Sequence, residues 1–344
     1  MRVLSYWQAL AEGLTQAMEH DPSVFVFGIG VDDHKGIFGT TRAAFERFGS
    51  ARVFDVPNAE GALTGIAIGA AAMGKRPVLV HPRNDFMFLA TDQMINLAAK
   101  WRYMYAGSSQ VPIVVRAIIG KGWGQGATHS QSLQALFGHF PGLSVVMPAV
   151  PSDAKGLILA ALRARGPVVV LEHRALYETR GPVPEAPEPT PIGTAEVRRE
   201  GRDVTVVATS LMVLEALRAA DDLATRGIDV EVVDCRSIRP LDADTIVRSA
   251  TKTGRVVVAD TSWVAFGVAA EVAALCADRA FGHLHAPVRR IGLADCPAPV
   301  SYALEPAFYP DRATIARECL AVAGRSPDEL GDVVVEESSF KGPY

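Results

Sequence analysis

Glu60 is the residue of this chain whose setting most strongly indicates chemistry. It follows the turn at Pro57 and Asn58 and precedes residues 62–73, where every side chain is small or apolar. Such a segment is typical of a helix buried on all sides, so the carboxylate would lie at the mouth of a buried helix. Capping of the helix, worth under about 1 kcal/mol, would also explain an acid here.

His129 is the second candidate, because it stands among the small and polar residues of a Thr-His-Ser-Gln loop rather than in a core. The glycine-rich residues 120–126 lead into this loop and lack the spacing of a phosphate-binding loop. Ligands of open α/β sheets bind at the carboxyl ends of the strands. A histidine delivered there can bind a ligand or move a proton at neutral pH.

Other kinds of site lack support in the sequence. There is no G-x-S-x-G nucleophile motif, and no His, Cys or acid cluster has metal-ligand spacing. The nearest case, Asp32-Asp33-His34, is typical of a solvated turn. The four cysteines have no C-x-x-C spacing and are expected to be free thiols in a reducing compartment. We expect no metal site in this chain with side-chain ligands.

Composition narrows the class of partner. The 344 residues are 49% hydrophobic and 21% charged, with a net charge of -4, and no run of Lys or Arg exceeds a pair. Binding of nucleic acid or of an anionic membrane is therefore not expected. The N-terminus shows no signal peptide and no apolar run is long enough to span a bilayer. These features predict a cytoplasmic protein.

Two α/β domains are predicted around the candidate residues. Apolar strands alternate with helical segments up to residue 180, as expected of a parallel sheet covered on both faces. Residues 181–193 hold five prolines and form a linker. A second alternation covers 194–325, and 326–344 form a polar tail that is mobile or lies on a partner. The expected fold is α/β, with two doubly wound parallel-sheet domains at 1–180 and 194–325.

The elements expected in the first domain lie at regular intervals. Strands are predicted at 24–28, 53–56, 77–81, 111–116, 144–147 and 167–171, and helices at 6–19, 62–73, 86–105, 132–137 and 153–164. In the second domain, strands are predicted at 204–208, 230–233 and 256–259, and helices at 212–225, 242–249 and 268–277.

Residues from about 24 to about 323 resemble the β subunits of the thiamin-diphosphate-dependent 2-oxo acid dehydrogenases of pyruvate or branched-chain type, relatives of the C-terminal half of transketolase. The segments that carry the resemblance are 55–69, with Glu60 and its glycine-rich helix, Thr91-Asp-Gln-Met-Ile-Asn-Leu-Ala-Ala-Lys100, His129-Ser-Gln131, Phe140-Pro-Gly-Leu143, 168–172 and Ile238-Arg-Pro-Leu-Asp242. The resemblance implies a pyrimidine-binding domain followed by a smaller domain like the transketolase C-terminal domain.

The resemblance also implies roles for individual residues. The acid that matches Glu60 hydrogen-bonds a ring nitrogen of the cofactor's aminopyrimidine and helps to activate the cofactor. Phe86 matches the aromatic residue that stacks on this ring, although a core role for Phe86 stays open, and Pro82 falls in the same cofactor-binding segment. His129 matches the histidine that assists substrate binding and transfer of an acyl group to a lipoyl group.

One family motif is missing from this chain. The segment that binds diphosphate and Mg2+ contains Gly-Asp-Gly, which occurs nowhere here. The resemblance therefore implies an α subunit that holds the Mg2+ and the diphosphate of a shared thiamin diphosphate. The expected assembly is a heterotetramer of two α and two β chains, with a lipoyl-bearing acyltransferase as a further partner. The implied reaction is decarboxylation of a 2-oxo acid with transfer of the acyl group to a lipoyl domain.

Departures from the family concern the substrate. The usual Glu-x-Gly is Glu60-Gly-Ala here, and polar His81, Arg83 and Asp85 replace an apolar stretch. In a purely structural role, Arg83 and Asp85 would pair with each other or with the α chain. In a functional role, His81 and Arg83 would bind the carboxylate or phosphate of a polar substrate. Binding of a phosphate there would favour a second function, that of a transketolase-like or acyloin-forming enzyme that moves a two-carbon ketol unit from a sugar phosphate. A subunit with only an assembly role is a third possibility.

A loop that binds a monovalent cation in some relatives would fall near Ile113 and residues 161–166. The side-chain ligand positions are occupied by Ala164 and Gly166, so any cation site would use main-chain carbonyls only. The residues that would contribute are Ile113, Ala161, Leu162, Ala164 and Gly166.

Overall fold

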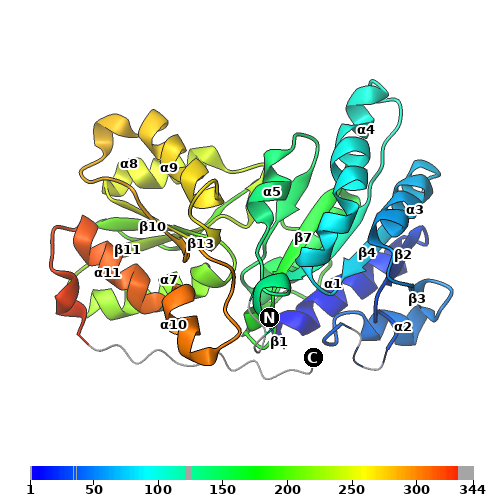
Figure 1. The fold of residues 1–344 in the computed structure, drawn as a ribbon, viewed down its shortest axis with the longest axis horizontal. Coiled ribbons are helices and arrows are strands. Elements are labelled where there is room, and N and C mark those ends of the chain that lie inside the picture. The colour runs from blue at the N-terminus through cyan, green and yellow to red at the C-terminus, as the bar shows by residue number, and fades with distance from the viewer. Residues whose placement is uncertain (1, 34, 36, 121–124, 332–344) are drawn as a thin grey trace. The chain divides into compact units, whose positions relative to one another are not determined.

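The computed structural model describes residues 2–33, 35, 37–120 and 125–331. These residues group into two compact units, the first comprising the described residues up to 120 and 136–192, the second 125–135 and 193–331 (Figure 1). No helix within the described ranges combines the length and apolarity needed to cross a membrane. Each unit contains a twisted sheet with helices packed on it, so the expected α/β class is confirmed.

The first unit contains most of the candidate residues. Its strands are β1 (Arg2–Ser5), β2 (Val24–Gly28), β3 (Val53–Asp55), β4 (Arg76–His81), β5 (Val114–Ile119), β6 (Ser144–Val146), β7 (Val168–His173) and β8 (Arg180–Val183). Its helices are α1 (Tyr6–His20), α2 (Arg42–Phe48), α3 (Glu60–Ala72), α4 (Ala99–Met104), α6 (Pro151–Arg163), the 3-10 helices η1 (Asn84–Ala90) and η4 (Arg174–Leu176), and the π-helix η2 (Gln93–Ala98). Within the helix α5 (Gln134–His139), the chain leaves the second unit after residue 135 and returns to the first unit.

The central sheet of the first unit is parallel, in the order β6-β7-β5-β4-β2-β3. Its strands are almost wholly buried apolar runs, as expected of a sheet covered on both faces. The carboxyl ends of β2, β3, β4 and β7 therefore share one edge, which carries the residues that follow these strands. Gly28 is required at this edge, because a Cβ there would lie 2.3 Å from the carbonyl oxygen of Val80.

A buried lysine joins the linker segment to the first unit. The Nζ atom of Lys155 on α6 donates to Glu12 Oε1 at 2.6 Å and to the carbonyl oxygens of Pro184 and Glu185 at 2.7 and 2.9 Å. The helices α1 and α6 can approach closely because Gly13 lacks a Cβ, which would lie 2.7 Å from Ile158 Cγ2. Residues just after β8 are therefore held in place despite their prolines.

The second unit has a mixed sheet in the order β14-β13-β10-β11-β9, in which the edge strand β9 is antiparallel and the others are parallel. The strands of this sheet are β9 (Glu196–Arg199), β10 (Val204–Ala208), β11 (Val230–Asp234), β13 (Val256–Trp263) and β14 (Arg289–Leu293), and the short strand β12 (Ser237–Arg239) does not belong to it. Its helices are η3 (Gly126–Thr128), α7 (Leu211–Ala224), α8 (Ala243–Thr253), α9 (Val268–Arg279), η5 (Phe281–His283), η6 (Tyr302–Leu304), α10 (Glu305–Phe308), α11 (Arg312–Val322) and η7 (Pro327–Leu330). Most of the predicted tail, 332–344, lies outside the described residues.

Two expectations are corrected by the structure. The single helix expected at 86–105 is broken into η1, η2 and α4. The expectation that the helix after Glu60 is buried on all sides is wrong, because Ile66 and Met73 are 58% and 84% exposed. Within this chain, only one face of α3 is needed to cover the sheet. By their contacts, residues 125–135 group with the second unit, although they stand within 1–180 in the sequence.

Candidate functional site

Glu60 is the first residue of α3 and is 8% exposed. The cap position before it is Ala59, which makes no side-chain capping bond. Within the described part of the chain, the Glu60 carboxylate makes no hydrogen bond and no ion pair. Capping through its side chain is therefore not what holds this acid in place. A buried carboxylate at the positive end of a helix, with no protein partner, is available to a ligand.

The segment that contains Phe86 packs against the start of α3. A Cβ at Gly61 would lie 2.9 Å from the carbonyl oxygen of Leu89 on η1 and 3.4 Å from Gln93 Oε1 on η2, so only glycine allows this approach. Phe86 lies on η1 and is half-buried rather than part of the closed core. The fold thus brings the segment of Phe86 against the segment of Glu60.

His81 and Pro82 join β4 to η1. His81 is buried, and within the described residues its Nε2 has no hydrogen-bond partner. Burial lowers the pKa of His81 from 6.5 to about 4, so the ring is neutral at neutral pH. The carbonyl oxygen of Pro82 accepts a 2.6 Å hydrogen bond from Arg83 Nη1, which fixes this turn.

Two buried guanidinium groups lie at the carboxyl ends of β4 and β7. Arg83 and Arg174 are 6% and 1% exposed, and the Arg174 guanidinium lies 4.9 Å from the centre of the Phe38 ring. Burial and the repulsion of Arg83 lower the pKa of Arg174 to about 10. Burial lowers the pKa of Arg83 as well, against the opposing effects of Tyr177 and Asp85. Arg174 follows an apolar strand without any motif, so sequence reasoning missed it.

A buried ion pair supports this edge of the sheet. Arg116 on β5 and Glu172 on β7 form two parallel hydrogen bonds, Nε to Oε1 at 2.6 Å and Nη2 to Oε2 at 3.0 Å. The Tyr177 hydroxyl donates to the same Oε2 at 2.9 Å. Both charged side chains are 1% exposed, so the pair is fully desolvated. Such a bidentate pair holds neighbouring strand ends in one geometry.

His129 lies in the second unit, directly after η3, and is half-buried. Its Nδ1 lies 2.9 Å from Thr128 Oγ1, with the donor set by the tautomer. The residues of the other candidate positions belong to the first unit, so the role of His129 stays a prediction.

Several carbonyl groups of the candidate cation loop accept hydrogen bonds from within the chain. Arg76 Nη1 donates to the carbonyl oxygens of Leu162 at 2.8 Å and Ala164 at 3.0 Å. The Ile113 carbonyl accepts from Val168 N at 2.9 Å, and the Ala161 carbonyl accepts from Ala164 N at 3.2 Å. A guanidinium charge thus stands beside these oxygens, where it would repel a second cation. Among the described residues, no group of three or more His, Cys, Asp or Glu side chains could hold a metal.

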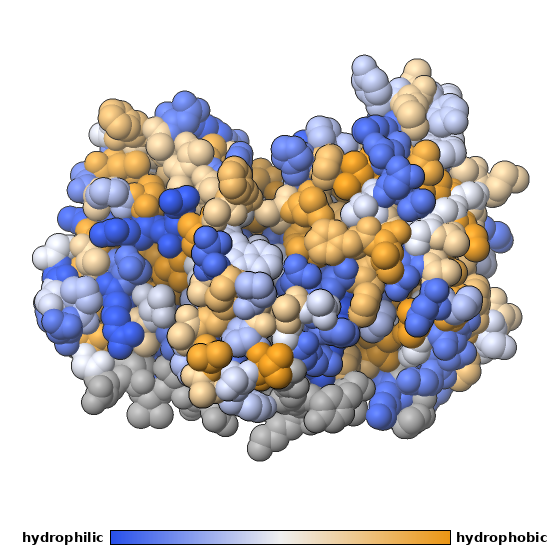
Figure 2. All heavy atoms as spheres, viewed as in Figure 1, coloured by the Kyte–Doolittle hydropathy of each residue, from blue (hydrophilic) through white to orange (hydrophobic). Residues whose placement is uncertain are grey.

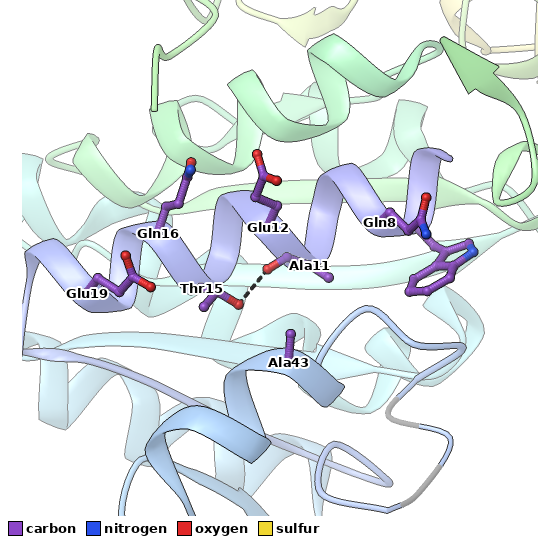
Figure 3. A pocket seen from close by; sticks show the side chains of 8 residues that line it. Gln8, Ala11, Glu12, Thr15, Gln16, Glu19 and Ala43 are labelled. Carbon is purple, nitrogen blue, oxygen red and sulfur yellow. Dashed lines mark hydrogen bonds between the residues drawn. The ribbon is translucent and has the colours of Figure 1, made fainter. Parts of the chain in front are cut away.

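A groove between α1 and α2 is a further cavity, shown in Figure 3, and it carries no catalytic chemistry. Its two carboxylates are neutralised by neighbours. Glu12 pairs with Arg2 and Lys155 at 2.6 Å each, and Glu19 pairs with Arg47 at 3.0 Å. We therefore locate the candidate site at the strand ends and not in this groove.

Two family models match the chain. The model of the transketolase pyrimidine-binding domain covers residues 2–180, and the model of the transketolase C-terminal domain covers residues 193–315. Among solved structures, a split gene transketolase described as an inactive beta4 tetramer matches with a TM-score of 0.75 at 25% identity, over 93% of this chain and 98% of that one.

Curated proteins match at higher identity. The chain is 42% identical to the acetoin:2,6-dichlorophenolindophenol oxidoreductase subunit beta of Cupriavidus necator, over 92% of this chain and 96% of that protein. It is 42% identical to the mitochondrial pyruvate dehydrogenase E1 component subunit beta-2 of Oryza sativa subsp. japonica, over 90% and 84%. It is 41% identical to the 2-oxoisovalerate dehydrogenase subunit beta of Bacillus subtilis, over 93% and 99%.

Proposed function

We propose a function from the family of this chain, which belongs to the β subunits of the thiamin-diphosphate-dependent 2-oxo acid and acetoin dehydrogenases. In this proposal the chain works with an α subunit to decarboxylate a 2-oxo acid and to pass the acyl group to a lipoyl domain. The observation that carries this proposal is the Glu60 carboxylate. It is buried, lies at the positive end of α3, and has no partner among the described residues.

Thiamin diphosphate fits the residues around Glu60. When bound, this cofactor supplies the carbanion chemistry that breaks the bond between a keto carbon and its carboxyl group. Glu60 would hydrogen-bond a ring nitrogen of the aminopyrimidine and hold or return a proton there. Phe86, half-buried on η1, would stack on the ring, and Pro82 would line the same wall. The contact at Gly61 supports this geometry, because it holds η1 against α3.

Within the first unit, we assign substrate binding to His81 and Arg83, and we assign a role in substrate handling to His129 of the second unit separately. Arg83 would attract the carboxylate of a 2-oxo acid, since a buried guanidinium binds a carboxylate strongly. His81, neutral at pH 7 because its pKa is about 4, would serve as a hydrogen-bonding group and not as a charge. His129 would donate and accept the proton during acyl transfer, as an imidazole can near neutral pH.

Association with an α subunit is supported by the surface of the first unit. Large apolar side chains are exposed along α3, η1 and α4, and apolar residues gather near α4 in Figure 2. These exposed residues are Ile66, Met73, Phe88, Leu89, Tyr103 and Met104. Apolar surface of this kind marks protein interfaces. The sequence has no Gly-Asp-Gly, so we assign Mg2+ and the diphosphate to the α subunit of a heterotetramer with two α and two β chains.

Transfer of a two-carbon ketol unit from a sugar phosphate is the second candidate. Arg83 and Arg174 place two buried positive charges near each other, which would suit an anionic donor. The match to a transketolase has 25% identity, against 42% for the dehydrogenase subunits, so we rank this function second.

The test uses the chain purified with its α subunit, thiamin diphosphate and a panel of donors. Glu60→Gln should lower kcat by about two to four orders of magnitude, as expected for loss of a proton-transferring group. Glu46→Gln is the control, because Glu46 is an exposed acid on α2 that pairs with Arg42. Release of an aldose phosphate without CO2 would replace the first function by the second. Full activity of Glu60→Gln would leave the chain with an assembly role only.

A further inference from the structure

The loop that contains His129 is tied to the second unit at its C-terminal end by Gln134. The Gln134 side chain is fully buried, and its Nε2 donates to Asp260 Oδ1 at 2.8 Å and lies 3.3 Å from Thr261 Oγ1. Asp260 and Thr261 lie on β13, 126 and 127 residues further along the chain. A side chain five positions after His129 thus anchors its loop to the sheet of the second unit.

The N-terminal end of the same loop is also held. Gly126 adopts a φ of +65° and lies so close to Val300 that a Cβ would stand 2.6 Å from Val300 Cγ2. Gly126 is buried, and His129 N donates to its carbonyl oxygen at 3.3 Å. Residues 126–134 are therefore attached to the second unit at both ends, with His129 between the two attachments.

Asp260 is a buried acid that the proposed reaction does not use. It is 1% exposed, and its Oδ1 accepts hydrogen bonds from Thr209 Oγ1 at 2.5 Å and from Thr261 N at 2.9 Å, in addition to Gln134. Burial is the main effect on its pKa, which is raised despite these hydrogen bonds. Burying a carboxyl group costs free energy, and the several hydrogen-bond donors that converge on Asp260 offset part of that cost. The contact is therefore a specific, ordered hydrogen-bond network.

One oxygen on each partner of this contact is still unsatisfied. Asp260 Oδ2 and Gln134 Oε1 are both buried, and neither accepts a hydrogen bond of ordinary geometry within the described residues, although the backbone N–H of Val268 also faces the Asp260 carboxylate and lowers its pKa. A single proton on the Asp260 carboxyl group would supply a donor that the pair lacks. An asparagine at position 260 would keep the Oδ1 acceptor and provide an N–H donor on the other atom. Asn is therefore the conservative replacement here.

We propose that Asp260 is a positioning residue for His129, acting through Gln134 to hold residues 126–134 in a single conformation. The claim that Asp260 holds residues 126–134 in place concerns the loop alone. The claim that this affects the reaction rests on the function proposed for His129. Asp260 itself touches neither cofactor nor substrate in this assignment. Its contribution is the loop geometry that lets His129 move a proton at the right place.

The experiment combines hydrogen exchange with kinetics on the complex with the α subunit. In Asp260→Ala, amides of residues 126–134 should exchange at least about tenfold faster, while Asp260→Asn should keep the slow exchange. Asp244→Asn is the matched control, because Asp244 is an exposed acid paired with Arg279. The rate of acyl transfer should fall about tenfold in Asp260→Ala, recover in Asp260→Asn, and show no further loss when His129→Ala is already present.

Each outcome decides the proposal. Unchanged exchange of 126–134 in Asp260→Ala would overturn it, and so would Asp260→Asn behaving like Asp260→Ala. If Asp260→Ala does not fold, Gln134→Leu removes the same contact from the loop side and must give the same faster exchange. If His129→Ala has full activity, the role proposed for His129 fails, while the exchange data still decide whether Asp260 positions the loop.

Discussion

Replacing Glu172 by glutamine tests how the strand ends at the candidate site are held together. The substitution keeps the shape of the side chain but leaves the Arg116 guanidinium, which is 1% exposed, without its counter-charge. It also removes acceptors for Arg116 Nη2 and the Tyr177 hydroxyl, which lie 3.0 and 2.9 Å from Oε2. Breaking a buried pair from one side costs about 3–5 kcal/mol. For a unit of this size, the loss corresponds to a fall of roughly 10 °C in Tm.

The assay is thermal and urea unfolding of the purified chain, followed by circular dichroism. Tyr177→Phe removes one hydrogen bond to the carboxylate and should cost less, about 1.5–3 kcal/mol. The double replacement Arg116→Met with Glu172→Leu removes both charges together and should recover most of the stability. The reasoning would be refuted if Glu172→Gln cost less than about 1 kcal/mol, or if the double variant were less stable than Glu172→Gln.

Stability at acid pH should depend on His81. Its pKa of about 4 in the folded chain lies below the unfolded value of 6.5, so protonation favours the unfolded chain as the pH falls. The free energy of unfolding, measured by urea titration, should fall by about 3 kcal/mol between pH 6.5 and pH 4, and His81→Gln should remove this loss. Gly61→Ala should weaken binding of thiamin diphosphate by roughly tenfold in calorimetry, because its Cβ would strike a carbonyl group of η1. Gly65→Ala faces open space and should stabilise the isolated chain by about 0.5–1 kcal/mol. Arg76→Gln should lower the free energy of unfolding by roughly 2 kcal/mol, measured by thermal unfolding, because two carbonyl groups lose their donor. The unchanged chain should have the same Tm in KCl as in NaCl.

Contrary results are equally specific for these variants. An acid-pH profile that His81→Gln leaves unchanged would contradict the neutral buried imidazole. Equal cofactor affinities for Gly61→Ala and Gly65→Ala would contradict the close packing of η1 on α3. A rise in Tm with KCl but not with NaCl would contradict the prediction that Arg76, and not a monovalent cation, stabilises the carbonyl groups of this loop.

The strands were the part of the fold that could be read most directly from the residues. The run at 24–28 is a strand with the predicted bounds, because a parallel sheet buried on both faces requires continuous apolar residues. The helix expected at 86–105 was less accessible. Its residues have helical periodicity, but the chain forms a 3-10 segment, a π-helix and a short α-helix in succession. In this irregular segment, Leu89 and Gln93 lie close to Gly61 on α3. These contacts join residues far apart in the sequence, so the local sequence pattern could not predict them.

By itself, the sequence determined the α/β class, the acid at the start of a glycine-rich helix, and the lack of a Gly-Asp-Gly segment, since each is a local pattern. Only the tertiary structure decided how the other charges are used. Arg174 beside Arg83, Arg76 at the carbonyl groups of the candidate cation loop, and Asp260 at Gln134 are pairs separated by 85 or more positions. Their energies depend on burial and distance, which arise when the strands assemble, and neither residue of such a pair indicates the other in sequence.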